Sequence, residues 1–222
     1  MISTLAELPT KNEICFEGFA SLSLICGPMF AGKTSQLIAD YRKHLADGRN
    51  PIIFAPAYDT RHKDGLRSHD GVCIEEHNIH RVSSVDSVIT ILRARARDNK
   101  ANALLFDEAQ FFHAPMFTGD LLRGLHAYSV GLRTLQDVNA VQQSSIDITF
   151  YGLDMDAQGR AFPAMSAIQS LSGLHVRKLT ARCHVCGACA PYTKRIAHST
   201  SDSQYAVGGS ESYQPACREH WL

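Results

Sequence analysis

The sequence contains no long hydrophobic run and no excess of charge of either sign. No apolar stretch approaches the roughly 20 residues that a membrane-spanning helix needs. Lys and Arg together number 22, as do Asp and Glu, so no overall field draws the chain to nucleic acid or to an anionic membrane. Charges at Glu7, Lys11, Glu13 and Glu17 interrupt the apolar region that a secretory signal peptide requires. We therefore expect neither nucleic acid nor a membrane as a partner.

The cysteines also lack the pattern of a disulfide framework, because there are seven of them, an odd number, spread unevenly over 222 residues. Small secreted domains held by disulfides carry an even number at regular spacings, so we expect reduced thiols and a cytoplasmic protein. The apolar content of 45% and the charged content of 20% are ordinary for a globular domain. The length suffices for one substantial domain with a small appended module.

The most informative motif that is present lies at residues 27–34, which read GPMFAGKT. This is a phosphate-binding loop pattern: Gly, four free positions, then Gly-Lys-Thr. Glycines let the backbone turn so that successive N–H groups face phosphate oxygens, and the following helix N-terminus adds positive charge. The alternative is a glycine-containing turn that binds nothing. We expect the loop to bind the phosphates of ATP through Gly27, Pro28, Met29, Phe30, Ala31, Gly32, Lys33 and Thr34.

Predicted strands and helices alternate along most of the chain. The strands are Phe19–Cys26, Pro51–Pro56, 102–106 and 147–153, with a possible edge strand at 71–75. The helices are 33–47, with Leu37, Ile38, Tyr41 and Leu45 on its buried face, then 84–98 and a helical region over 114–143. This alternation predicts an α/β fold with a parallel sheet flanked by helices. From about residue 181, Cys, His, Gly and Ser replace periodic apolar residues, so we expect domains 1–180 and 181–222.

A second part of the nucleotide site follows the strand at 102–106, which ends in Asp107 and Glu108. Parallel sheets present their ligands at the carboxyl ends of strands, so both acids should lie beside the phosphate loop. Asp107 would hold Mg²⁺ together with the Thr34 hydroxyl, while Lys33 would contact the β- and γ-phosphates. Glu108 could accept a proton from an attacking hydroxyl or water. Without the upstream loop, two acids after a strand would be a weak signal.

Two chelating pairs near the end of the chain have the spacing of a zinc site. Cys183 and Cys186 form a C-x2-C pair, and Cys217 and His220 form a C-x2-H pair. Four such ligands match a closed, structural Zn²⁺ site. The second pair argues against a redox dithiol, and four ligands leave no open position for a catalytic zinc. Cys189 or His184 could still replace one of the four.

Taken together, the motifs resemble the cellular-type (type II) thymidine kinases over most of the chain. The matching stretches are GPMFAGKT at 27–34, DTR at 59–61, DEAQFF at 107–112, YGLDMD at 151–156, CHVC at 183–186, YTKR at 192–195, VGGSESY at 207–213 and CREH at 217–220. Their order and spacing carry the resemblance more than any one fragment beyond the phosphate loop.

The resemblance implies transfer of the ATP γ-phosphate to the 5′-hydroxyl of deoxythymidine, with dTMP as the product in nucleotide salvage for DNA synthesis. In that reading Glu108 is the general base, Lys33 and Arg61 assist the transfer, and Asp59 belongs with Thr34 and Asp107 at the magnesium. It also implies structural zinc, feedback inhibition by thymidine triphosphate and a homotetramer.

The resemblance further implies an apolar slot for the base, closed by a loop carried on the zinc-binding module. The matching positions are Met29, Phe111, Phe162, Thr193, Gly208 and Tyr213. Arg195, like Arg61, matches a residue that binds near the transferring phosphate of the substrate. Paired glycines at 208 and 209 would let backbone approach a flat base. Aromatic residues and Met also fill ordinary cores, so Met29, Phe111 and Phe162 have a purely structural alternative.

This sequence departs from the family pattern in a few places. Ala31 and Ala157 stand where serine and an aromatic residue are common, and 113–147 exceeds the usual connection by about a dozen residues.

Two other functions remain open at this point. One is a P-loop ATPase whose zinc ribbon grips nucleic acid, although 175–222 holds only six Lys or Arg against three acids. The other is a regulatory nucleotide-binding module without turnover.

Overall fold

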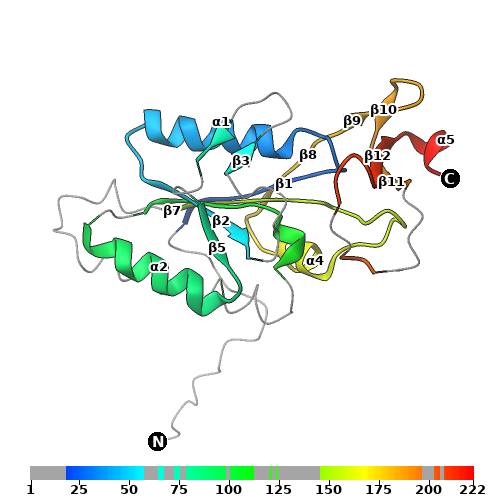
Figure 1. The fold of residues 1–222 in the computed structure, drawn as a ribbon. Helices are drawn as coiled ribbons and strands as arrows, with labels where there is room; N and C mark the ends of the chain where they lie inside the picture. Colours follow the sequence, from blue (N-terminus) through cyan, green and yellow to red (C-terminus); the bar gives the residue numbers. More distant parts are fainter. Residues whose placement is uncertain are drawn as a thin grey trace, which may run out of the picture.

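A six-stranded parallel sheet forms the centre of the molecule (Figure 1). The computed structural model describes residues 19–57, 65–67, 73–75, 79–98, 101–112, 121, 124, 146–196, 203–205 and 208–222. The strand order is β5-β2-β6-β7-β1-β8, and every neighbouring pair is parallel. The strands are β1 (Phe19–Cys26), β2 (Pro51–Pro56), β5 (Ile79–Val82), β6 (Ala103–Phe106), β7 (Ile146–Gly152) and β8 (His175–Lys178).

Helices cover both faces of the sheet, α1 on one side and α2 and α4 on the other (Figure 1). They span α1 (Lys33–Ala46), α2 (Val85–Asp98) and α4 (Pro163–Gln169). Side chains alternate along each strand, so Ile25 packs with Leu37 of α1 while its neighbour Leu24 packs in the core that holds Leu92 of α2. Both faces of the sheet are therefore apolar, as a doubly covered parallel sheet requires.

A row of three stacked aromatic rings crosses the middle of the sheet. Phe54, Phe106 and Phe150 occupy paired positions on β2, β6 and β7. The centroid of Phe106 lies 5.1 Å from each of the other two rings, at interplanar angles of 22° and 26°. Because Phe106 is the last residue of β6, this row fixes the point from which Asp107 and Glu108 emerge.

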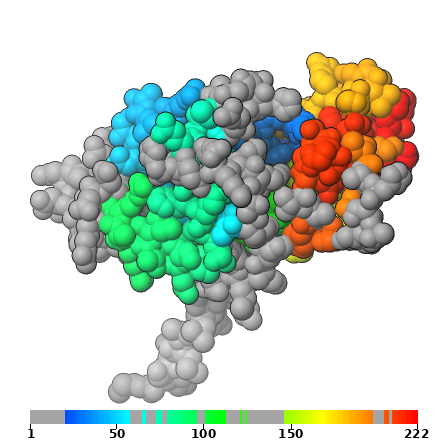
Figure 2. Space-filling model, in the orientation of Figure 1, coloured from blue at the N-terminus to red at the C-terminus, as the bar shows by residue number. Residues whose placement is uncertain are grey.

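Small two-stranded sheets accompany the central one. β3 (Leu66–Arg67) pairs with β4 (Cys73–Ile74). At the C-terminus, β9 (Ala181–Arg182) pairs with β10 (Cys189–Ala190), and β11 (Tyr192–Arg195) with β12 (Tyr213–Ala216) before the short helix α5 (Arg218–Trp221). These C-terminal elements gather at one end of the molecule in Figure 2, where they run from yellow-orange to red.

The predicted α/β fold with a parallel, helix-flanked sheet is confirmed, and the predicted spans of β1 and β2 match the observed strands. The predicted boundary near Thr180 falls between β8 and β9, where the chain leaves the central sheet. The division into two domains stays a prediction. Of the region predicted helical at 114–143, the structure describes Leu121 and Gly124, both helical.

One prediction about the core is wrong. Leu45 was expected on the buried face of α1, but its side chain is 50% exposed. It lies in the last turn of the helix, beyond the part that the sheet covers. Leu37 and Ile38 are buried as predicted, and Tyr41 packs at the edge of the same cluster.

Three elements of the central sheet and its covering helices have no counterpart in the prediction. β5 has a weak pattern of four residues, and β8 is an edge strand whose residues are all exposed, so neither carries an apolar run. α4 is only seven residues long, although Pro163 at its start is a recognisable signal. Among the described residues, no helix combines the length and hydropathy needed to cross a membrane.

We expect Tyr151→Phe to lower the free energy of unfolding by about 1 kcal/mol. The Tyr151 side chain is fully buried, and its hydroxyl donates a 2.7 Å hydrogen bond to Asp40 of α1, which ties this helix to β7. Urea unfolding measures the change. Leu45→Ala in the last, exposed turn of α1 is the control and should stay within about 0.5 kcal/mol of the parent. Equal losses in the two variants would contradict the assignment.

Candidate active site

The predicted site residues gather around one cavity at the carboxyl edge of the central sheet. The cavity has a volume of about 1380 Å³, and its walls come from the phosphate loop, the end of β6, the segment after β7 and the C-terminal strands. A typical small-molecule pocket occupies roughly 300–1,000 Å³, so this one has room for more than a single nucleoside. Its walls include most of the predicted residues: Met29, Phe30, Ala31, Gly32, Lys33, Thr34, Glu108, Phe111, Phe162, Thr193, Gly208 and Tyr213.

Four predicted residues lie beside the cavity without forming its wall, namely Gly27, Pro28, Asp107 and Arg195. Asp107 is 6% exposed, directly after β6, and its N–H donates a 2.8 Å hydrogen bond to the Phe54 carbonyl. The Arg195 guanidinium lies over the ring of Tyr213. Asp59 and Arg61 fall outside the described residues.

The phosphate loop starts with a close contact between two backbones. Gly27 has φ +152°, and a Cβ at this position would lie 2.3 Å from the Leu179 carbonyl oxygen. The Leu179 N–H in turn donates a 2.7 Å hydrogen bond to the Cys26 carbonyl. Only glycine fits between β1 and the segment that follows β8, and this contact sets where the loop leaves the sheet.

Lys33 is folded back over the loop that carries it. Its ammonium group donates hydrogen bonds to the carbonyls of Gly27 at 3.1 Å and Pro28 at 2.6 Å. Burial lowers the pKa of Lys33, and the negative charges of Glu108, Asp154 and Asp107 oppose that shift. A cation held among acids and main-chain carbonyls is prepared to exchange these partners for phosphate oxygens.

Glu108 has an unusual backbone conformation. Its φ of 49° and ψ of 47° lie in the left-handed region, which a non-glycine residue adopts at a cost of about 1–3 kcal/mol. The short 3-10 helix η2 (Ala109–Phe111) follows at once, and the Phe111 N–H donates to the Glu108 carbonyl at 2.9 Å. The turn directs the Glu108 side chain to the cavity wall, while Asp107 remains buried behind it.

Gln110 holds the Glu108 carboxylate in place. Its side-chain amide nitrogen donates to Glu108 Oε2 at 2.5 Å, and its amide oxygen accepts from the Leu153 N–H at 2.9 Å. The side chain is fully buried, so both of its polar ends are satisfied inside the protein. Sequence reasoning missed Gln110, because an amide within an apolar stretch carries no distinctive pattern.

Asp154 is a second site residue that sequence reasoning did not assign. It is 8% exposed at the end of β7, and its carboxylate lies 3.4 Å from the Lys178 ammonium. Its charge stabilises the protonated form of Lys33. The available signal was its place two residues after the end of a core strand.

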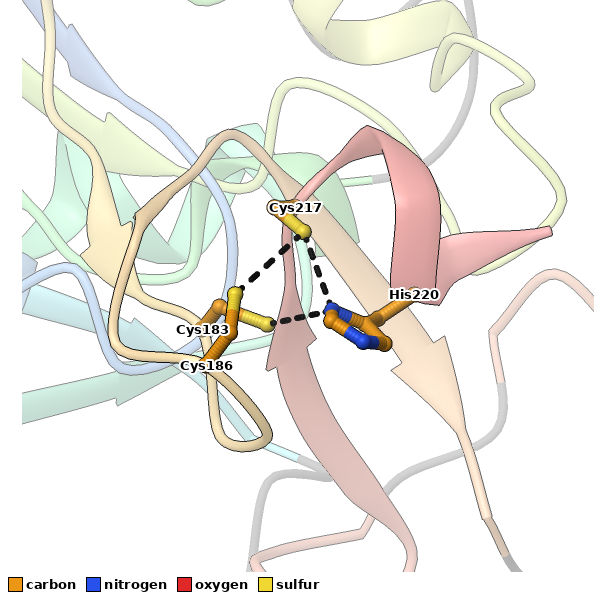
Figure 3. Close-up of side chains that lie close together, drawn as sticks. All are labelled: Cys183, Cys186, Cys217 and His220. Atoms are coloured by element: carbon orange, nitrogen blue, oxygen red, sulfur yellow. Dashed lines mark hydrogen bonds between the residues drawn. The ribbon is translucent and has the colours of Figure 1, made fainter.

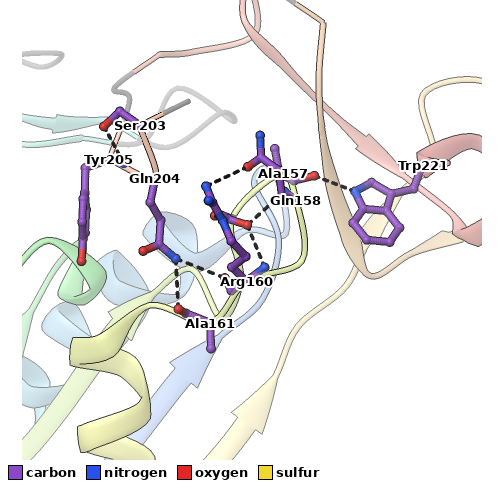
Figure 4. A network of polar contacts seen from close by, with 9 residues as sticks. Ala157, Gln158, Arg160, Ala161, Ser203, Gln204, Tyr205 and Trp221 are labelled. Carbon is purple, nitrogen blue, oxygen red and sulfur yellow. Dashed lines mark hydrogen bonds and ion pairs between the residues drawn. The ribbon is translucent and has the colours of Figure 1, made fainter. Parts of the chain in front are cut away.

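Aromatic rings line another part of the cavity. Phe111 and Phe162 are 6% and 2% exposed, and both meet the ring of Tyr205, at centroid distances of 6.5 and 5.7 Å. The neighbouring Gln204 donates a 3.0 Å hydrogen bond to the Ala161 carbonyl (Figure 4). These contacts bring the segment 203–205 over the aromatic wall, which sequence reasoning assigned only to Phe111 and Phe162.

Contacts within the protein already favour glycine at position 208. A Cβ at Gly208 would meet the side chain of Ser212 at 2.8 Å and the Tyr213 ring at 3.1 Å. The space is therefore limited by the loop itself. The Gly209 N–H donates to Glu211 Oε1 at 2.6 Å, which adds to the compact turn.

The two chelating pairs meet as predicted (Figure 3). Ligand atoms of Cys183, Cys186, Cys217 and His220 all lie within 4.8 Å of one another, and neither Cys189 nor His184 belongs to the group. Sulfurs about 2.3 Å from a tetrahedral zinc are about 3.8 Å apart. Cys186 Sγ and Cys217 Sγ lie 3.8 Å apart, and His220 Nδ1 is 3.6 Å from Cys183 Sγ. The donor set and spacing fit zinc.

The electrostatics of the cluster also suit a metal. Backbone N–H groups, that of Cys217 first and that of Cys186 next, lower the pKa of the Cys183 thiol to about 5. A thiolate is the form that binds zinc. Within the described part of the module, the apolar core contains only Ala181, Cys183, Ala190 and Cys217, with Ala31 packed against it, so a metal has much to contribute to its stability.

Comparison with known proteins agrees with this geometry. The family model described as thymidine kinase matches residues 20–123 and 132–221. The chain belongs to the thymidine kinase family. Thymidine kinase a of Arabidopsis thaliana is 31% identical over 208 residues, which cover 92% of this chain and 76% of the relative. Every described part of the cavity wall thus lies within the stretch that carries the family's pattern.

We expect Cys183→Ser to abolish metal binding, because it removes one of four ligands from a site with few other contacts. Metal analysis of purified protein should find one zinc per parent chain and almost none in the variant. Cys189→Ser is the matched control, since this exposed thiol belongs to the same module and lies outside the cluster. Full zinc retention in Cys183→Ser, or its loss in Cys189→Ser, would contradict the ligand assignment.

Proposed function

We propose that this protein is an ATP-dependent thymidine kinase that transfers the γ-phosphate to the 5′-hydroxyl of deoxythymidine. The observation that carries the proposal is the shared wall of one cavity, where the phosphate loop with Lys33 faces Glu108. Family membership supports thymidine as the nucleoside, and the phosphate loop supports a nucleoside triphosphate as the phosphate donor. Nothing in the structure favours the nucleic-acid ATPase or a non-catalytic module over this function.

The chain's own residues account for the main requirements of phosphoryl transfer. Backbone N–H groups of the phosphate loop and the Lys33 ammonium would neutralise the phosphate oxygens. Glu108, oriented by Gln110, would position the attacking hydroxyl and take its proton late in the reaction. Phe111 and Phe162 offer apolar faces against which a flat base can stack.

Two metal ions complete the proposal. Thr34 and Asp107 would hold Mg²⁺, which neutralises charge on the triphosphate, and Asp59 is the third predicted ligand. Cys183, Cys186, Cys217 and His220 would hold a zinc that keeps the C-terminal strands folded against the phosphate loop. The roles of Arg61 and Arg195, inhibition by thymidine triphosphate, the homotetramer and the cytoplasmic location stay predictions.

One assay tests the proposed function directly. Purified protein receives Mg·ATP with deoxythymidine, with single-stranded DNA, or with neither, and both ATP consumption and phosphorylated nucleoside are measured. We expect consumption only with deoxythymidine, matched by an equal amount of dTMP. Stimulation by DNA without dTMP would replace the proposal with the ATPase, and ATP binding without turnover in any arm would favour a regulatory module.

We expect Glu108→Gln to reduce kcat by about 100- to 10,000-fold, because the amide keeps the shape of the side chain and cannot accept the proton. The affinity for Mg·ATP, measured by calorimetry, should change little. Glu219→Gln on the exposed side of α5 is the control and should behave like the parent protein. Turnover within about tenfold of the parent in Glu108→Gln would remove Glu108 from the role of general base.

A further inference from the structure

Trp221, the only tryptophan of the chain, makes a contact that the proposed mechanism does not use. Its indole N–H is shared between two carbonyl oxygens, that of Ala157 at 3.0 Å and that of Thr193 at 3.2 Å. Figure 4 shows the indole N–H of Trp221 pointing at the carbonyl oxygen of Ala157.

The two accepting residues belong to different walls of the cavity. Ala157 lies in the segment between β7 and α4, whereas Thr193 lies on β11 of the C-terminal module. Both residues line the cavity. One N–H group on α5 therefore bridges two walls that are 36 positions apart in the sequence.

The indole ring fits tightly between the same two parts of the protein. It stacks on Tyr192 with centroids 4.5 Å apart and planes 11° from parallel. Gly159 also lies close to the indole, since a Cβ at this position would come within 3.0 Å of the ring. Stacking and close approach fix the orientation of the ring, so the direction of its N–H is fixed as well.

The contact continues to the phosphate loop through Thr193. Thr193 is buried, with 5% of its surface exposed, and its hydroxyl accepts a 3.0 Å hydrogen bond from the Met29 N–H. The main-chain N–H of Trp221 donates a 3.0 Å hydrogen bond to the carbonyl of Cys217. Cys217 and His220, the residue before Trp221, are both predicted zinc ligands. Trp221 thus connects α5, both cavity walls and the phosphate loop.

We propose that Trp221 is a positioning residue for nucleoside binding. Its two hydrogen bonds set the distance between β11 and the segment after β7, and this distance depends on how α5 packs against both. This inference rests on the proposed thymidine kinase activity. Trp221 itself is not among the residues that line the cavity. Trp221 would stabilise the bound nucleoside to the same extent in the ground state and in the transition state. Its loss should therefore raise KM for the nucleoside and leave kcat nearly unchanged.

The test compares Trp221→Phe with the parent in the full-length, zinc-containing protein. Phenylalanine keeps a ring for stacking on Tyr192 and lacks the N–H donor. Losing one hydrogen bond to these carbonyls should raise KM for deoxythymidine about 3- to 10-fold at saturating ATP, with kcat within about twofold and zinc content unchanged. Leu222→Ala is the matched control, because this neighbouring side chain is 87% exposed, and it should keep the parent values.

A KM for Trp221→Phe equal to that of Leu222→Ala, or a loss of kcat with KM unchanged, would overturn the proposal. If the variant loses zinc or fails to fold, the fluorescence of the single tryptophan in the parent protein provides the test instead. Saturating deoxythymidine without ATP should shift the tryptophan emission, because the ligand sits between the walls that the indole joins. An unchanged emission at saturation, with binding confirmed by calorimetry, would overturn the proposal.

Failure of the inference is distinguishable from failure of the proposed function. A parent protein that does not phosphorylate deoxythymidine refutes the function. In that case a chelator that strips zinc should still red-shift the emission, since α5 would release the indole from both walls, and an unshifted emission would refute the positioning role too.

Discussion

The site depends on the meeting of parallel strand ends at one edge of the sheet, fixed by the backbone contact of Gly27 with Leu179. Parallel strands deliver everything that follows them to the same side. β1 therefore delivers the phosphate loop, β6 delivers Asp107 and Glu108, and β7 delivers Asp154. Because Gly27 has no Cβ, the loop can start against the main chain that follows β8, and from there its residues 29–34 line the cavity.

The catalytic edge combines a firm support with local strain. The stacked rings of Phe54, Phe106 and Phe150 hold the end of β6 between its neighbours. On that support the chain adopts a left-handed turn at Glu108, and Gln110 restrains the carboxylate from the side. A conformation that costs about 1–3 kcal/mol persists when surrounding structure determines it, and such residues concentrate at functional sites.

The C-terminal module is part of the site as well as an attachment to it. Ala31 of the phosphate loop packs against the small core formed by Ala181, Cys183, Ala190 and Cys217. The Met29 N–H bonds to Thr193 of the same module. A metal held by the Cys/His cluster would therefore couple the folding of the module to the shape of the phosphate loop through these contacts.

The parts of the site that could be predicted from the sequence are those where a residue type at a given spacing has one characteristic chemical role. The glycines and Lys33 of the loop, the acids after β6 and the four zinc ligands have such signatures. The predicted burial of Leu45 was wrong because periodicity indicates which face of a helix is apolar, but not how much of the helix length the sheet covers. Gln110, Tyr205 and Trp221 have no such signature, since amides and aromatic rings serve any core. Their roles come from contacts between segments far apart in the sequence.

The central claim is that the loop at 27–34 binds a triphosphate next to Glu108. Calorimetric titration of Mg·ATP into the parent protein and into Lys33→Ala tests it most directly. The account predicts one binding site per chain in the parent and at least a tenfold weaker affinity in the variant, about 1.4 kcal/mol of lost binding free energy. No heat of binding in the parent, or equal affinities in the two proteins, would contradict it.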